Sequence, residues 1–92
     1  MKVNFYATLR EIVGGKTVEI PLENGTTVQG LLETLFERYP RLRRELVDEQ
    51  GNLYPHVHVF VNGRDAPFLN AGMQTPISAE DVISIFPAVG GG

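Results

Sequence analysis

Cysteine is absent from the 92 residues of the sequence. Its absence excludes disulfide bonds, thiolate metal ligands and a cysteine nucleophile. No run approaches the roughly 20 apolar residues that a membrane-spanning helix needs, and residues 1–10 lack the apolar segment of a signal peptide. We therefore expect a cytoplasmic protein that does not act at a membrane.

Basic residues are also too few to favour nucleic acid as a partner, since the formal net charge is -3 and phosphate binding needs a positive surface. The lysines are Lys2 and Lys16. Four of the six arginines cluster within residues 38–44, and acidic residues follow within residues 45–49. This mixture of charges indicates a solvated helix face, or a partner contact that depends on salt.

The short length predicts a single domain over residues 1–92, with residues 86–92 as its C-terminal tail. A chain of this size buries somewhat more than about 60% of the surface that its unfolded form exposes, which is enough for one modest core. Little room remains for a deep catalytic cleft. Whether the chain is an enzyme stays open, and we expect a non-catalytic subunit that acts with partners.

Motifs that carry chemistry are weak in this sequence. Gly14-Gly15-Lys16-Thr17 ends like a phosphate-binding loop, but Arg10 occupies the place of the required earlier glycine. His56 and His58 lie two apart on an expected strand and so on one face. Without a third ligand they indicate exposed histidines and no metal site. Paired carboxylates fall in expected turns or on exposed faces, which does not indicate an acid/base pair.

Hydrophobic patterning predicts the secondary structure. Alternation of apolar and polar residues predicts strands over residues 2–9, 17–22, 56–61 and 82–86. A capping box of Thr26 and Gln29 precedes an apolar stripe at helical spacing, and Pro40 stops it, which together predict the main helix. A second short helix is expected over 41–50, a hairpin turn at 62–63 and a loop over 67–76.

The order of these elements indicates the fold class. It runs strand, strand, helix, strand, short edge strand, strand. One sheet with one main helix packed on one face is an α+β architecture. The β-grasp fold has this order, and its core would lie between the helix stripe and the inward faces of the strands.

The chain ends in the run Val89-Gly90-Gly91-Gly92. Glycine lets other groups approach the backbone closely, which suits a tail that enters a partner's active site. The stretch from Phe86 to Gly92 spans at most roughly 20 Å when extended. An α-carboxyl has a pKa of about 3.3–3.7, so it is ionised near neutrality and must be activated before a group can be attached. The alternative is a frayed end without a function.

Both ends of the chain resemble the MoaD family, which comprises the small subunit of molybdopterin synthase and its relatives. Residues 3–11, VNFYATLRE, are similar to the family's opening strand and loop. Residues 81–92 are similar to its last strand and its Phe-Pro-x-Val-x-Gly-Gly end, with Gly90 at the second variable position. Residues 57–68 resemble a branch with an inserted hairpin. That branch includes MoaD-like proteins and the carrier that supplies sulfur to a cysteine synthase.

The resemblance implies a ubiquitin-like β-grasp fold with a mixed sheet, and a sulfur carrier that holds no cofactor or metal of its own. An adenylating partner of the ubiquitin-activating type would use ATP and magnesium to adenylate Gly92. Sulfur would then replace the adenylate and give a thiocarboxylate, with Gly90 and Gly91 as the flexible tail. The large subunit of molybdopterin synthase, or another sulfur acceptor enzyme, would bind a surface formed by Phe60, Val82, Ser84, Phe86, Pro87 and Val89.

The destination of the sulfur stays open. Molybdopterin is the first candidate, as part of a molybdopterin synthase, and cysteine or methionine synthesis and tRNA thiolation are the others. The same activated terminus would serve a ubiquitin-like modifier joined through Gly92 to lysines of other proteins. Long self-chains are not expected from Lys2 and Lys16 alone. The last alternative is a binding module with an inert tail.

Overall fold

The fold is known from a computed structural model, which describes residues 1–23 and 25–87. The strands are β1 (Lys2–Phe5), β2 (Thr17–Glu19), β3 (His58–Val61), β4 (Arg64–Asp65) and β5 (Ile83–Phe86). The α-helices are α1 (Leu9–Val13), α2 (Val28–Arg38) and α3 (Pro40–Leu46), and two 3-10 turns, η1 (Ala66–Phe68) and η2 (Gly72–Gln74), precede β5. None of the helices in the described ranges is long and apolar enough to cross a membrane.

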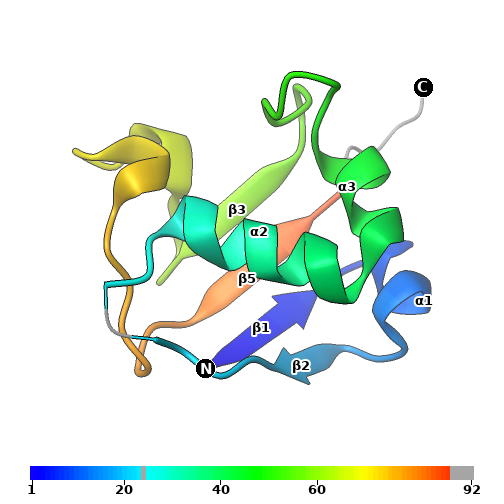
Figure 1. The fold of residues 1–92 in the computed structure, drawn as a ribbon, viewed down its shortest axis with the longest axis horizontal. Helices are drawn as coiled ribbons and strands as arrows, with labels where there is room; N and C mark the ends of the chain where they lie inside the picture. The colour runs from blue at the N-terminus through cyan, green and yellow to red at the C-terminus, as the bar shows by residue number, and fades with distance from the viewer. Residues whose placement is uncertain (24, 88–92) are drawn as a thin grey trace.

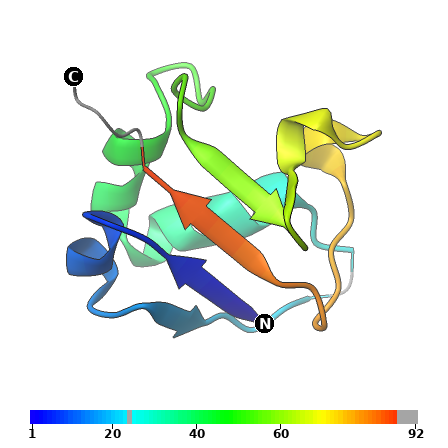
Figure 2. The same ribbon diagram turned by 180° about the vertical axis from the view of Figure 1, so that it is seen from behind.

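The strands form one mixed sheet in the order β2-β1-β5-β3-β4. β1 and β5 are parallel, whereas the other neighbouring pairs are antiparallel. Helix α2 crosses one face of this sheet (Figure 1), and Figure 2 shows β1, β5 and β3 from the opposite face, which no helix crosses. The expected α+β class with a mixed sheet and one main covering helix is confirmed.

A single hydrophobic core lies between α2 and the sheet. The stripe predicted on the main helix supplies buried residues at helical spacing, and β1, β3 and β5 supply alternate residues that face it. The central members, all buried, are Val28, Leu31, Leu32, Leu35, Val3, Phe5, Val59, Ile83 and Ile85. Because alternate residues of a strand point to opposite faces, their neighbours lie on the open face.

The first strand is shorter than its alternation predicts. β1 ends at Phe5, and the chain turns at Ala7, whose φ of 53° lies in the left-handed region. The N–H of Leu9 then donates to the carbonyl of Tyr6 at 3.2 Å, and Leu9 is buried as the first residue of α1. Gly14, with a φ of 82°, ends this helix. The predicted pairing of β1 and β2 is confirmed, but the link between them contains a helical turn.

The main helix begins one residue later than the capping box predicts. The N–H of Gly30 donates to Thr27 Oγ1 at 3.1 Å, which makes Thr27 the N-cap. Thr26 Oγ1 donates instead to the carbonyl of Glu23 at 2.7 Å. Thr27 is extended, and it pairs with Pro76 in an isolated β-bridge. This long-range pairing sets the start of the helix and leaves no mark in the local pattern.

The segments after α2 differ from the prediction in extent. The second helix begins at Pro40, a favourable first helical position for proline, and ends at Leu46 because Val47 pairs with Leu53. The expected loop over 67–76 contains the 3-10 turns η1 and η2. These turns are short and local, so hydrophobic periodicity does not reveal them.

The predicted hairpin turn at Asn62-Gly63 is confirmed, with left-handed φ angles of 53° and 83°. Asn62 also ties this turn to the start of β5. Its N–H donates to the carbonyl of Val82, and its Oδ1 accepts from the Val82 N–H, both at 2.8 Å. Asp81 accepts from Asn62 Nδ2 at 2.9 Å and from the Ser78 N–H at 2.8 Å. The strand that leads to the C-terminal tail is therefore held at Val82, the residue that precedes it.

These contacts predict a pH-dependent contribution to stability. The hydrogen bond from the Ser78 N–H, followed by that from Asn62, lowers the pKa of Asp81 below its usual value of 3.8. A lowered folded pKa stabilises the fold at higher pH, and this stability is lost as the pH falls past 3.8 and through the folded pKa. We expect Asp81→Asn to lower the free energy of unfolding by about 1 kcal/mol at neutral pH. Denaturant titrations over a pH series should show the deficit shrinking in acid; a constant deficit would contradict this origin.

Candidate functional site

The predicted site residues Val89, Gly90, Gly91 and Gly92 lie outside the described residues. The structure does define the place from which they start. Pro87, the last described residue, is buried and follows β5 directly. Five peptide units separate Pro87 from Gly92, a reach of at most roughly 18 Å. A group carried at Gly92 would therefore act within this distance of the end of β5.

The strand at the base of the tail is the central strand of the sheet. Ile85 pairs with Phe5 of β1 on one side and with Val59 of β3 on the other. Because both edges of β5 are hydrogen-bonded, a pull on the tail acts against two strand ladders. This arrangement suits a terminus that is handled by another protein.

Aromatic rings form a continuous row across the open face at this end of the sheet. The rings of Tyr6 and Phe86 are stacked, with centroids 4.1 Å apart and planes at 10°. Phe60 meets Phe86 edge-on at 5.5 Å, and His58 is stacked on Phe60 at 5.6 Å. We call Tyr6, Phe86, Phe60 and His58 the aromatic row. Apart from the exposed His58, its members are half-buried, so they present apolar surface beside the base of the tail.

Strand register explains why the row is continuous. His58 lies directly opposite Phe86 in the antiparallel pair of β3 and β5, and Phe60 lies opposite Ser84. Directly opposed and diagonal side chains of neighbouring strands come within contact distance of each other. Tyr6 follows β1, the parallel neighbour of β5 on the other side. Three neighbouring strands therefore each add aromatic surface to the same face.

Polar groups close the row at both ends. The Arg10 guanidinium lies over the Tyr6 ring, 5.3 Å from its centroid, and Arg10 Nε donates to the carbonyl of Phe5 at 2.9 Å. A cation over an aromatic face is attracted by the ring quadrupole. At the other end His58 Nδ1 lies 2.9 Å from Asp65 Oδ2. The row is thus an apolar strip between a cationic end and a histidine–carboxylate end.

A shallow hollow of about 280 Å³ lies at the histidine end of the row. Its lining is His56, His58, Phe60, Phe86 and Pro87. It is therefore the hollow next to the start of the tail. Its mostly aromatic walls could receive one apolar side chain of a partner.

The predicted binding surface is largely brought together. Phe60, Ser84 and Phe86 share the open face, as expected from their alternation. Val82 belongs to the same alternation and is 51% exposed, but it lies at the opposite end of β5 from the tail. Pro87 is buried and lines the hollow. Their role in binding stays a prediction.

Sequence reasoning missed Tyr6, Arg10 and Asp65 as parts of this face. The signal for Tyr6 was available, since it alternates with the core residues of β1. Arg10 comes back to Tyr6 only because the chain turns into α1 after that strand. Asp65 reaches His58 through the tight turn at 62–63, which pairs Phe60 with Asp65. Both placements depend on turn geometry and not on periodicity.

The weaker candidates do not combine into a site of their own, although His56 and His58 line the same hollow. His58 lies on β3, but His56 precedes that strand in a turn with a left-handed φ of 73°. In the described ranges no three His, Cys, Asp or Glu side chains come together as metal ligands. In the arginine cluster, Arg43 pairs with Glu33 at 3.1 Å and lies over the Phe36 ring at 4.9 Å. These contacts fit the predicted solvated helix face.

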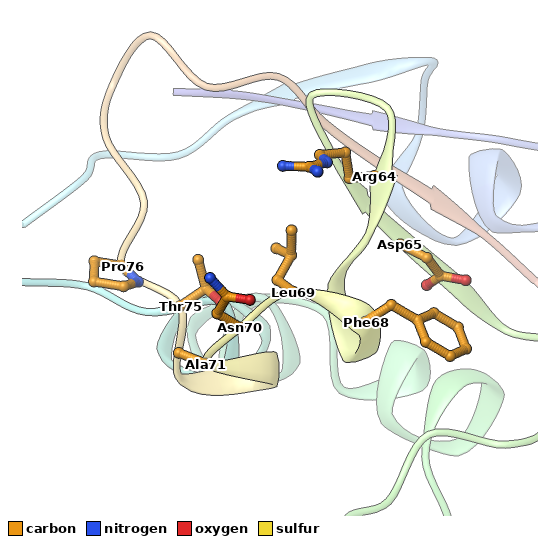
Figure 3. Close-up of a pocket in the computed structure, with 8 residues that line it drawn as sticks. All are labelled: Arg64, Asp65, Phe68, Leu69, Asn70, Ala71, Thr75 and Pro76. Carbon is orange, nitrogen blue, oxygen red and sulfur yellow. The ribbon is translucent and has the colours of Figure 1, made fainter.

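A larger hollow of about 540 Å³ lies beside β4 and the 3-10 turns. Figure 3 shows the residues that line it, which come from β4, from the 3-10 turns and from the segment that follows them: Arg64, Asp65, Phe68, Leu69, Asn70, Ala71, Thr75 and Pro76. The turns that form most of its wall lie across the molecule from the end of β5 (Figure 2). Its lining offers one arginine and one aspartate, and its other residues are Phe, Leu, Asn, Ala, Thr and Pro. This lining does not resemble a nucleophilic or metal-binding site. The face beside Pro87 is the better candidate site.

Comparisons with known proteins identify relatives of this chain. The model of the ThiS family matches residues 3–92. Small archaeal modifier protein 3 of Haloferax volcanii is 38% identical over 92 residues, which cover 100% of this chain and 98% of the relative. The crystal structure of SAMP1 from Haloferax volcanii superposes with a TM-score of 0.83 at 30% identity, over 99% of this chain and 97% of that one. A chain of the Amycolatopsis orientalis BexX/CysO complex gives a TM-score of 0.79 at 32% identity, over 99% and 98%.

Proposed function

Because this chain belongs to the ThiS family of ubiquitin-like sulfur carriers and modifiers, we propose that it carries sulfur on its own C-terminal carboxylate. The group at Gly92 is adenylated by a ubiquitin-activating-type partner that uses ATP and magnesium. A sulfur donor then displaces AMP, which leaves a thiocarboxylate at Gly92. The observation that carries this proposal is that the central strand β5 ends beside the aromatic row, shortly before three glycines, Gly90 to Gly92, in the sequence.

The chemistry of the chain supports a carrier that relies on partners. The sequence has no cysteine to hold sulfur. An ionised carboxylate is a poor electrophile, so its activation needs a nucleotide-using enzyme. The chain itself needs only to present its end, and it holds no cofactor in this scheme.

The aromatic row supports the way in which the chain meets these partners. A partner that takes Gly92 into its active site must come within roughly 18 Å of Pro87. It then lies against the end of the sheet where Tyr6, Phe86 and Phe60 offer apolar surface. The few residues that carry most of the binding energy of protein interfaces are enriched in Tyr, Trp and Arg, and this end of the sheet presents Tyr6 with Arg10 over its ring. The activating enzyme and the sulfur acceptor would use this face in turn.

The destination of the sulfur is a finer proposal. The Phe-Pro-x-Val-x-Gly-Gly end resembles the small subunit of molybdopterin synthase, so we place the molybdopterin large subunit first among the acceptors. The similarity to a chain of the BexX/CysO complex supports a different acceptor enzyme equally well. Co-purification of the chain from its own cells with a large synthase subunit, or with another acceptor enzyme, would separate the two.

A second function, as a ubiquitin-like modifier, is favoured by a specific observation. The relative with 38% identity is named a small archaeal modifier protein. In a modifier, the amine of a lysine on another protein would attack the adenylated carbonyl of Gly92, which forms an isopeptide bond and releases AMP. A peptide from cell extracts in which Gly92 is joined to a lysine side chain would establish this function beside the carrier function.

Reconstitution tests the carrier proposal. The purified chain is incubated with the activating enzyme of its organism, ATP, magnesium and a sulfide donor, and its intact mass is measured. We expect a gain equal to one sulfur replacing one oxygen, which disappears without ATP. An unchanged mass, with an enzyme proved active on another carrier, would falsify the proposal.

A further inference from the structure

The histidine at one end of the aromatic row is held by a carboxylate. His58 Nδ1 lies 2.9 Å from Asp65 Oδ2, and the two side chains are 46% and 20% exposed. The imidazole also stacks on Phe60, with planes at 20°. Its position and its ring plane are therefore both fixed, although half of the ring remains accessible to a partner.

The carboxylate also determines which nitrogen of His58 carries the proton. An ionised carboxylate only accepts hydrogen bonds, so Nδ1 must donate to Asp65 Oδ2. In the neutral imidazole the other nitrogen, Nε2, is then a hydrogen-bond acceptor. No side chain or backbone group in residues 1–23 or 25–87 donates to Nε2 at hydrogen-bond distance. The histidine end of the row thus presents an unused acceptor beside an apolar hollow.

In the described part of the chain, the side chain of Asp65 has one hydrogen-bond partner, His58. Its second oxygen, Oδ1, is buried and has no hydrogen-bond partner in the described part of the chain. A buried carboxylate oxygen without a partner is costly to the fold. The hydrogen bond to His58 is partly exposed, so its own net contribution to stability is small. The arrangement is better explained by what it does to His58.

We propose that His58 is a specificity-determining residue for the activating enzyme, and that Asp65 is the positioning residue that keeps its Nε2 an acceptor. This inference rests on the proposed function. The enzyme would fill the hollow with an apolar side chain and donate an N–H or O–H to Nε2. At the other end of the row an acidic group would meet Arg10.

Such an acceptor discriminates between partners more sharply than apolar contact does. A partner without a matching donor leaves a buried polar group unpaired, which costs more than a missing methylene group. A partner that presents another acceptor at this point is rejected by repulsion. His58 would therefore select the enzyme that activates this carrier over those that serve other carriers.

Asp65→Asn tests the inference because it reverses the polarity of the pair. The side-chain amide introduced at position 65 has two possible orientations. With its nitrogen in the place of Oδ1, that nitrogen would be buried without an acceptor. We therefore expect the nitrogen to take the place of Oδ2 and to donate to His58 Nδ1. Nε2 then carries the proton and becomes a donor. We expect KM for the carrier in the adenylation reaction to rise about tenfold, the equivalent of about 1.4 kcal/mol, with kcat unchanged. The melting temperature, measured alongside, should change little.

His58→Gln is the matched control for loss of the imidazole. The oxygen of its side-chain amide can take the place of Nε2 as an acceptor, and the amide nitrogen can donate toward Asp65. We expect His58→Gln to retain KM within about threefold, and His58→Asn, which is too short to reach that position, to behave like Asp65→Asn. Equal KM values for the wild type, Asp65→Asn and His58→Asn would overturn the inference while leaving the carrier function intact. Failure of the wild-type chain to be adenylated would instead overturn the proposed function.

Discussion

Removal of Gly91 and Gly92 abolishes thiocarboxylate formation and leaves the fold unchanged: this is the largest effect that the proposed function predicts. The reactive carboxylate is then displaced by two residues and no longer reaches the active site of the activating enzyme. Catalysis tolerates little misplacement, since a shift of about 1 Å can cost about 100-fold in rate. Intact mass after reconstitution measures the loss.

The fold should survive because every buried residue of the hydrophobic core comes from the sequence range Val3 to Ile85, which the truncation leaves intact. We expect the melting temperature of the truncated chain to agree with that of the wild type within about 2 °C, which corresponds to less than about 0.5 kcal/mol. Gly15→Ala serves as a control, because it alters a glycine far from the tail in the sequence and the added Cβ meets nothing within 4 Å. We expect this variant to form the thiocarboxylate like the wild type. A truncated chain that still gained sulfur would show that the terminal pair is not the working end.

Phe86→Ala should weaken activation by about 30-fold in KM for the carrier. Phe86 is the centre of the aromatic row, stacked on Tyr6 and in edge contact with Phe60. Truncation of an aromatic residue at the centre of an interface typically costs about 2 kcal/mol or more of binding energy. The loss of these contacts should also lower the free energy of unfolding by about 1–3 kcal/mol, so the assay is run well below the melting temperature.

Phe68→Ala is the matched control for this variant. Phe68 is 86% exposed, and it belongs to η1, beside the larger hollow and outside the aromatic row (Figure 3). We expect KM to stay at the wild-type value and stability to change by less than about 0.5 kcal/mol. If Phe68→Ala raised KM and Phe86→Ala did not, the partner would bind the edge formed by η1 and not the aromatic row.

The fold was predictable because its core follows simple periodicity. The apolar stripe on α2 and the alternation in β3 and β5 each indicate one buried face of the element. The structure has these elements where the patterns predict them. The limits of β1 and α2 were not predictable in the same way. The turn at Ala7 and the bridge between Thr27 and Pro76 depend on the packed structure. Local sequence carries no record of such long-range contacts.

The candidate site was predictable to a similar degree. Phe60, Ser84 and Phe86 fall on one face because they alternate with core residues on paired strands. Arg10 and Asp65 were missed because a turn brings each of them to the row. The position of the tail at the end of a central strand required the sheet order, in which β5 lies between β1 and β3.

The central claim is that the working group of this protein is the carboxylate of Gly92. The most direct measurement is tandem mass spectrometry of the C-terminal peptide from chain isolated after reconstitution with ATP, magnesium and a sulfide donor. The account predicts that one sulfur replaces one oxygen at Gly92, and that no other residue of the peptide changes mass. Sulfur found at a different residue, or a Gly92 that stays an ordinary carboxylate while the acceptor enzyme receives sulfur, would contradict it.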